Sequence, residues 1–388
     1  MGFRWVQKNV SPIGIDIGAD SVKLLQIARE TEAPQLIGAG RVEIPQELRQ
    51  DASQHAAFVA DAIRQILKQS KFKGKRVITA LSSAQAYVQH VRLAKCDPSM
   101  IEGQIQAELR GRLPMDPSQM VMRHVSVGEV FSDGATKQEM ICMAASREFV
   151  LRLVNTVRSA GLDVVGMHCE PMAILAAFEH LFEGKTDANQ TTMFVDIGSS
   201  TTKVLIAHGR QLVFAKTIQV GGEHFNKLVG ELMQVSSAEA RMVRIREAEE
   251  GVRPQFSAAE GTLQMLGSTA VVRPAEQPKV ADATELAERV LASEMLEVLI
   301  DELQLCAGYH GAMFHDRPID KMIFLGGESR QTAICQRIAQ AMRMPAQLGD
   351  PLARVVRAPL TPSPGVDLHR SQPGWAVPMG LCLLPTNL

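Results

Sequence analysis

Two stretches, one in each half of the chain, share the same alternation of apolar and polar positions. Residues 13–27 read IGIDIGADSVKLLQI, and residues 194–206 read FVDIGSSTTKVLI. In each, a strand-like run reaches an Asp (Asp16 or Asp196), a Gly follows two positions later, and a second strand-like run begins after a short polar turn. The pattern predicts two copies of one β-hairpin unit.

The elements that follow each hairpin also repeat. A third strand is predicted near 36–44 and near 211–220, and a helix near 51–69 and 223–233. Two β-β-β-α units predict an α/β protein with two lobes, the first over 1–190 and the second over 191–388.

The first lobe is expected to carry an inserted α+β subdomain at about 84–150. Its predicted elements are an extended run at 84–94, a helix at 99–113 and strands near 120–130 and 138–145. In the second lobe, residues 244–282 show little periodicity and predict a mobile insertion, and a helix is expected to resume over 283–314. The C-terminal segment is expected to return toward the first lobe.

Composition narrows the function classes. Lys plus Arg (41) nearly balances Asp plus Glu (42), which favours no nucleic-acid partner. The 6 Cys form no C-x-x-C pair, which predicts buried, reduced thiols. No apolar run approaches the roughly 18 residues that span a bilayer, so a cytoplasmic location is expected.

The two hairpin turns carry the candidate chemistry. Gly at such a turn lets backbone N–H groups approach a phosphate, and hydroxyl groups add donors. A carboxylate repels phosphate but holds Mg²⁺ through its water shell. The alternative is an ordinary hairpin whose Asp bonds its own backbone. The candidates are Asp16, Gly18, Asp20, Ser21 and Lys23 in the first hairpin and Asp196, Gly198, Ser199, Ser200, Thr201 and Lys203 in the second.

Three further motifs accompany the hairpins. Gly221 and Gly222 precede the helix of the second unit, and Gly326 and Gly327, followed by Glu328, end a predicted strand at the start of a helix. Glu170 precedes a Pro at a predicted helix N-terminus. There it either complements the helix dipole or orients an attacking water.

The ordered set DIGADSVK, CEPMAILAA, DIGSSTTK, VGG and LGG resembles the actin-like ATPase superfamily. Within it, the chain resembles the PilM proteins of type IV pilus assembly and, less closely, the cell-division protein FtsA. The resemblance implies two ribonuclease-H-like lobes with a nucleotide cleft, and ATP and Mg²⁺ as cofactors. It also implies that Asp16 and Asp196 anchor the metal and that Glu170 and Asp196 act in hydrolysis.

The resemblance further implies a partner. PilM-like proteins dock the cytoplasmic N-terminal peptide of a PilN-like inner-membrane protein, and this would bring the chain to the inner face of the inner membrane with other platform components. Ile105, Leu109 and the link at Leu113 to Met115 either line the peptide groove or pack the subdomain. Whether the chain forms a homo-oligomer stays open.

Two departures from the family pattern keep other functions in view. Ala19 replaces a usual Ser or Thr, and Glu328 replaces a usual small residue. A nucleotide-free scaffold on the same fold is therefore one alternative, and a small-molecule kinase is another. A kinase needs a general base for its substrate, and only Glu170 is a candidate. The sequence thus favours an assembly adaptor that is at most a slow ATPase.

Overall fold

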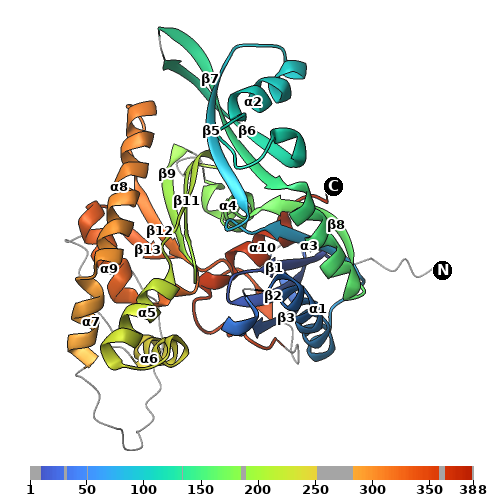
Figure 1. Cartoon of the computed structure of the whole chain (residues 1–388), viewed down its shortest axis with the longest axis vertical. Coiled ribbons are helices and arrows are strands. Elements are labelled where there is room, and N and C mark those ends of the chain that lie inside the picture. Colours follow the sequence, from blue (N-terminus) through green and yellow to red (C-terminus); the bar gives the residue numbers. More distant parts are fainter. Residues whose placement is uncertain are drawn as a thin grey trace, which may run out of the picture. The chain divides into compact units, whose positions relative to one another are not determined.

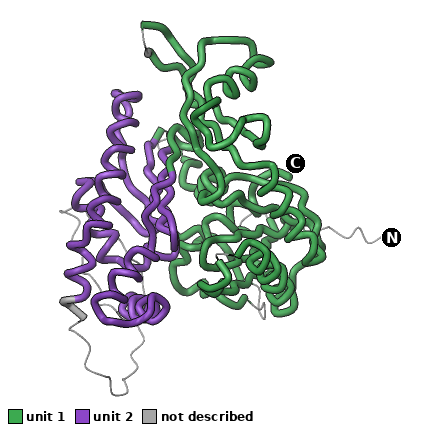
Figure 2. Tube along the Cα trace, viewed as in Figure 1, with its two compact units in different colours: residues 1–189, 207–216, 350–388 green, residues 190–206, 217–349 purple. Residues whose placement is uncertain are grey.

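The computed structural model describes residues 10–29, 33–49, 51–132, 134–184, 189–250, 283–357 and 363–386. The chain divides into two compact units, shown in Figure 2. Unit 1 comprises residues 1–189, 207–216 and 350–388, and unit 2 comprises residues 190–206 and 217–349. Each unit combines helices with a β-sheet, and each is described separately below.

Unit 1 is built on a six-stranded sheet with the order β14-β3-β2-β1-β4-β8 (Figure 1). Neighbouring strands β1, β4 and β8 are parallel, whereas β2 is antiparallel to both β1 and β3. The strands are β1 (Ile13–Ile17), β2 (Ser21–Ala28), β3 (Gln35–Glu43), β4 (Arg76–Leu81), β8 (Asp163–Cys169) and β14 (Val356–Arg357).

Helices cover both faces of this sheet. They are α1 (Ala52–Gln69), α3 (Arg147–Ser159), α4 (Glu170–Ala177) and α10 (Ala376–Leu383). A Cβ at Gly14 of β1 would collide with α10, and a Cβ at Gly40 of β3 would collide with α1. Gly14 pairs with Leu25 and Gly40 with Leu24, and these neighbouring leucines point to opposite faces. The two helices therefore lie on opposite faces, and the central strands are buried on both sides.

The inserted subdomain is a three-stranded sheet of order β5-β7-β6 with one helix packed on it (Figure 1). Its elements are β5 (Ala86–Ala94), α2 (Ile101–Leu109), β6 (Met120–Ser132) and β7 (Ala135–Ser146). Ile105, Leu109 and Leu113 are buried in its core, at 2%, 0% and 8% exposure. They pack the subdomain, which is the second of the two roles that the sequence left open for them; Met115 is half-buried.

A buried charge lies where this subdomain meets β11 (Gln211–Ile218), whose first residues belong to unit 1. The carboxylate of Glu139 is fully buried and pairs with Arg92 Nε at 2.9 Å and His90 Nδ1 at 3.0 Å. The other ring nitrogen of His90 lies 3.3 Å from the Ala215 carbonyl, and its ring stacks on Phe214. One polar cluster therefore joins β5 and β7 to β11.

Unit 2 is built on a five-stranded sheet with the order β11-β10-β9-β12-β13. Its remaining strands are β9 (Thr191–Ile197), β10 (Thr202–His208), β12 (Lys321–Leu325) and β13 (Ala346–Leu348). Its helices are α5 (Gly222–Met233), α6 (Ser237–Glu250), α7 (Ala283–Leu291), α8 (Glu294–Met313) and α9 (Thr332–Met342). Across the described ranges, no helix combines the length and apolar character needed to cross a membrane.

The helices of unit 2 differ from the expected pattern in two places. Helix α6 continues to Glu250, so residues 244–250 are helical and not part of an extended insertion. Residues 251–282, the rest of the expected insertion, lie outside the described residues. The helix expected over 283–314 is divided, because the Ser293 hydroxyl accepts a hydrogen bond from Leu296 N–H and begins α8.

The cysteines are free thiols, most of them in the core. All six cysteines are free, and all but Cys96 are buried. Burial raises the pKa of Cys142 and Cys382 to about 11 and that of Cys169 to about 12. These thiols stay protonated at neutral pH and are therefore poor nucleophiles. The prediction that the thiols are buried is confirmed for these five cysteines.

Candidate functional site

The first hairpin places a carboxylate at the end of β1. The turn is closed by a hydrogen bond from Gly18 N–H to the Ser21 carbonyl, 3.0 Å long. The strand register then sets Lys23 directly opposite Asp16, with Nζ 3.6 Å from Oδ2. Asp16 is only 6% exposed, so the lysine offsets much of the cost of burying its charge.

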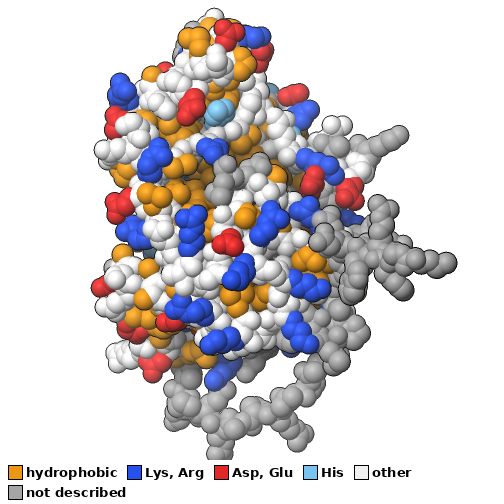
Figure 3. Space-filling view, turned by 90° about the vertical axis from the view of Figure 1, so that its right-hand side faces the viewer, with side chains coloured by type: hydrophobic (Ala, Val, Ile, Leu, Met, Phe, Trp, Pro, Cys, Tyr) orange, Lys and Arg blue, Asp and Glu red, His pale blue; other side chains and the backbone are white. Residues whose placement is uncertain are grey.

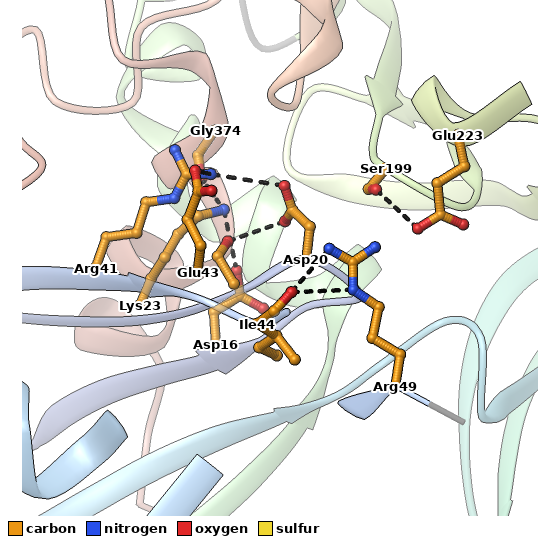
Figure 4. Close-up of polar contacts among 11 residues, drawn as sticks. Asp16, Asp20, Lys23, Arg41, Glu43, Ile44, Arg49, Ser199, Glu223 and Gly374 are labelled. Carbon is orange, nitrogen blue, oxygen red and sulfur yellow. Dashed lines mark hydrogen bonds and ion pairs between the residues drawn. The ribbon is translucent and has the colours of Figure 1, made fainter. Parts of the chain in front are cut away.

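Lys23 also connects this hairpin to the C-terminal segment. Its ammonium donates to the Gly374 carbonyl at 2.8 Å, as Figure 4 shows. Gly374 lies two residues before the buried helix α10. Lys23 therefore joins the first hairpin to the C-terminal segment.

Asp20 and Ser21, two predicted phosphate ligands, bond mainly to each other and to β3. Ser21 is fully buried and its hydroxyl donates to Asp20 Oδ1 at 3.0 Å. Arg41 lies 3.5 Å from the other oxygen of Asp20 (Figure 4). Arg41 was not predicted from the sequence. The pairing of β2 with β3, which sets Arg41 opposite Lys23, is the feature that could have identified it.

The second hairpin, in unit 2, repeats the geometry of the first. Gly198 N–H donates to the Thr201 carbonyl at 3.0 Å. Lys203 Nζ donates to Asp196 Oδ2 at 3.2 Å, and Asp196 is 5% exposed. The repeat seen in the sequence is therefore a repeat of side-chain contacts as well as of strands.

The predicted Gly221–Gly222 turn packs directly on the second hairpin. Gly222 N–H donates to the Gly198 carbonyl at 3.0 Å, and Glu223 N–H to the Ser199 carbonyl at 2.7 Å. The Ser199 hydroxyl donates to Glu223 Oε1 at 3.2 Å (Figure 4). A Cβ at Gly221 would lie 2.7 Å from the Ser199 carbonyl oxygen, so only glycine fits there.

The Gly326–Gly327 turn lies against the same hairpin. Strand β12 runs parallel to β9 and pairs Leu325 with Asp196. Gly326 has φ +87°, and a Cβ there would collide with Asp196 Oδ1 and the Ile197 carbonyl. Unit 2 thus brings together three motifs that lie far apart in the sequence.

A buried arginine that sequence reasoning missed connects these motifs. Arg244 of α6 donates to Glu328 Oε2 at 2.6 Å and to the Gly222 carbonyl at 3.1 Å. It also donates to Asn226 Oδ1 at 2.6 Å and lies over the Phe225 ring. Its side chain is 4% exposed. Arg244 lies in the stretch expected to be an unstructured insertion, so its sequence context gave no signal.

Glu170 begins α4 and is 3% exposed. Its Oε2 accepts a 2.6 Å hydrogen bond from the backbone N–H of Ser83. Because β1, β4 and β8 are parallel, Asp16, Ser83 and Glu170 lie at or just after the carboxyl ends of their strands, at one edge of the sheet. That edge is where α/β sheets bind ligands.

The carboxylates of Asp16, Asp196 and Glu170 suit a metal ion that keeps its water shell better than one held by protein ligands alone. The part of the chain that the structure describes contains no group of three or more His, Cys, Asp or Glu arranged to bind an ion. Mg²⁺ prefers oxygen ligands, keeps several waters and takes few carboxylates together with phosphate oxygens. Isolated carboxylates next to glycine turns fit that requirement.

Comparison with known proteins confirms the predicted actin-like α/β fold. The family model described as "Type IV pilus assembly protein PilM" matches residues 14–249. A solved PilM-PilN type IV pilus biogenesis complex is similar at 19% identity and TM-score 0.73, covering 97% of this chain and 98% of that one. The ethanolamine utilization protein EutJ from Carboxydothermus hydrogenoformans is similar at 12% identity and TM-score 0.51, covering 96% of this chain and 89% of that one. No curated protein matches in sequence.

We predict that Arg244→Met lowers the free energy of unfolding by about 3 kcal/mol, because it leaves the Glu328 carboxylate without its cation beside Gly222. Arg337→Met is the matched control. That arginine also lies 2.6 Å from its glutamate, but both side chains are more than a third exposed, and its loss should cost under about 1 kcal/mol. Denaturant unfolding measures the free energy of unfolding of both variants. Equal losses would show that burial does not make the Arg244–Glu328 pair more stabilising than an exposed pair.

Proposed function

Because the chain belongs to the PilM family of type IV pilus assembly proteins, we propose that it is an adaptor that binds ATP with Mg²⁺ and docks a peptide of an inner-membrane protein. The observation that carries the nucleotide part is the repeated hairpin. Asp16 with Lys23 and Asp196 with Lys203 adopt the same cross-strand pairing next to the same Gly turn.

In this proposal Asp16 and Asp196 hold the water shell of Mg²⁺, and the cation neutralises phosphate charge. Each lysine keeps its carboxylate in one orientation and offsets a negative charge that would otherwise repel phosphate. The turn glycines offer backbone N–H groups to phosphate oxygens. The residues proposed to contact nucleotide are Gly18, Asp20, Ser21, Lys23, Gly198, Ser199, Ser200, Thr201, Lys203, Gly221, Gly222, Gly326, Gly327 and Glu328.

The alternative of a nucleotide-free scaffold rests on Ala19 and Glu328. Glu328 is weak evidence against nucleotide binding. Its carboxylate pairs with Arg244 at 2.6 Å and therefore presents little unpaired charge to a nucleotide. Ala19 removes one hydroxyl donor but leaves the backbone turn of the first hairpin unchanged. ATP binding is therefore the function that these contacts support best.

We predict that ATP raises the thermal unfolding midpoint only when Mg²⁺ is present. Ligand at 100 times its Kd adds about 2.7 kcal/mol of stability. Asp196→Asn should remove most of this gain, because it removes a metal anchor, whereas Ser199→Ala should remove little, because Ser199 Oγ is already bonded to Glu223. Differential scanning fluorimetry measures all three proteins. Absence of any shift at millimolar Mg·ATP would favour the scaffold.

Glu170 is proposed to orient the attacking water, and hydrolysis is proposed to be slow, since an adaptor gains from a long-lived bound state. Its carboxylate is fixed by Ser83 N–H, so it has one orientation at the edge of the sheet. We predict that Glu170→Gln, which keeps this acceptor, preserves ATP affinity and lowers the hydrolysis rate at least about tenfold, within the range typical of general acid–base groups. Phosphate release assays test this, and a turnover near the enzyme median of about 10 s⁻¹ would point to an enzyme class instead.

The proposed partner is a PilN-like protein of the inner membrane, and the chain would be cytoplasmic and recruited by it. The similar solved structure is a PilM-PilN complex, which motivates the proposal. Because Ile105 and Leu109 are core residues, docking would use the outer strands β5 and β6 and exposed apolar side chains. Tyr87 and Met100 are 39% and 55% exposed on this subdomain.

We predict that a labelled N-terminal peptide of the partner binds with an affinity that changes little with salt, because apolar anchors and main-chain hydrogen bonds dominate such docking. Tyr87→Ser with Met100→Ser should weaken binding at least about tenfold, as hot-spot anchors do. Leu305→Ser, which removes a 64% exposed side chain in unit 2, should have no effect. Fluorescence anisotropy measures the peptide affinity of the unaltered chain and the two variants. Unchanged affinity of the double variant would show that Tyr87 and Met100 do not contact the peptide.

A further inference from the structure

The loop between α1 and β4 carries a concentration of positive charge that the proposed function does not use. Residues 62–76 contain six Lys or Arg and no Asp or Glu, in a chain whose net charge is -1. We define the basic loop as the five side chains from residue 68 onward: Lys68, Lys71, Lys73, Lys75 and Arg76. All five are exposed. None forms an ion pair or side-chain hydrogen bond with any residue in the described ranges of the chain.

The backbone beneath these cations is held firmly in place. The buried side chain of Gln26 accepts a hydrogen bond from Lys73 N–H at 2.7 Å and donates to the Lys73 carbonyl at 2.8 Å. The Ser70 hydroxyl donates to the Ala39 carbonyl at 2.6 Å, and Asp163 N–H to the Lys75 carbonyl at 2.8 Å. The backbone positions from which these cations extend are therefore fixed.

The basic loop lies at the edge of the unit 1 sheet opposite the candidate nucleotide residues. It leads into the first residue of β4, whereas Asp16, Ser83 and Glu170 lie at or just after the carboxyl ends of the parallel strands β1, β4 and β8. A strand of six residues spans roughly 20 Å. At physiological salt, charges that far apart are screened from one another. The basic loop therefore does not serve the phosphates of a nucleotide.

The composition of the basic loop favours a diffuse anionic surface as its ligand. Four of its five cations are lysines, which act as point charges and lack the planar fork that arginine uses for specific carboxylates or phosphates. Phe72, the aromatic residue among them, packs beside Gly38 of β3 and is only half-exposed, so it offers no stacking platform for a base. On the face drawn in Figure 3, Lys and Arg side chains are spread over the middle and lower part, with acidic side chains among them as well as at the margins.

We propose that the basic loop binds the anionic headgroups of a phospholipid bilayer. Clusters of four to eight Lys or Arg close to a membrane gain about 1 kcal/mol of attraction per side chain. Such binding is weak when it acts alone. Combined with a membrane-anchored partner it would strengthen attachment through effective concentration.

Vesicle flotation of the full chain, without nucleotide or peptide, tests this independently of the proposed function. The probes are vesicles of phosphatidylcholine alone and with about 30 mol % phosphatidylglycerol. We expect binding only to the anionic vesicles, and its release as salt rises from about 50 to about 500 mM. A variant with Lys68→Gln, Lys71→Gln, Lys73→Gln and Lys75→Gln should bind at least about tenfold more weakly; these changes leave the Gln26 bonds intact because they involve the Lys73 backbone.

The matched control removes four exposed cations from unit 2: Lys227→Gln, Arg246→Gln, Arg317→Gln and Arg343→Gln. It changes net charge equally and should bind as the unaltered chain does. Equal loss in both variants, or equal binding to neutral vesicles, would overturn the proposal. Retention on polyglutamate or duplex DNA at salt that releases the vesicles would also overturn it and assign the basic loop to an acidic protein or a nucleic acid.

Discussion

The pairing of an aspartate with a lysine across each hairpin is the interaction on which the candidate site depends. Asp16 and Asp196 sit at the carboxyl ends of buried strands, at 6% and 5% exposure, where an uncompensated charge would be costly. The register that places Lys23 and Lys203 opposite them supplies the compensation. The glycine turn sets the register, and the register sets both the ion pair and the position of the carboxylate. The chain uses this arrangement twice.

The same constraint governs the other buried carboxylates of the described residues. Glu139 is held by Arg92 and His90, and Glu170 accepts the backbone N–H of Ser83. Each partner comes from an element other than that of the acid: Arg92 and His90 lie on β5, and Ser83 lies in the turn between β4 and β5. Burial of an acid therefore joins two elements wherever it occurs, and at Glu139 it joins the inserted subdomain to β11, the strand that leads on toward Gly221 and Gly222.

The hairpins, the helix at Glu170 and the subdomain strands could be predicted because their signals are local: apolar alternation, a turn glycine, and a Pro after the helix start. The contacts that tie the motifs together could not. Arg244 and Glu328 are far apart in sequence, and Arg244 lies on a helix whose apolar pattern is weak. Ile105 and Leu109 illustrate another limit of the sequence. Their spacing is consistent both with a core and with a groove, and only the packing seen in the structure assigns them to the core.

The central claim is the proposal that the buried, lysine-paired aspartate of each hairpin is needed for Mg·ATP binding. The most direct measurement is Mg·ATP affinity by isothermal titration calorimetry, with Asp16→Asn and Asp196→Asn each compared with the unaltered chain. The account predicts that each change weakens binding, because each removes a carboxylate that anchors the metal through its water shell. Unchanged affinity in either variant would contradict it.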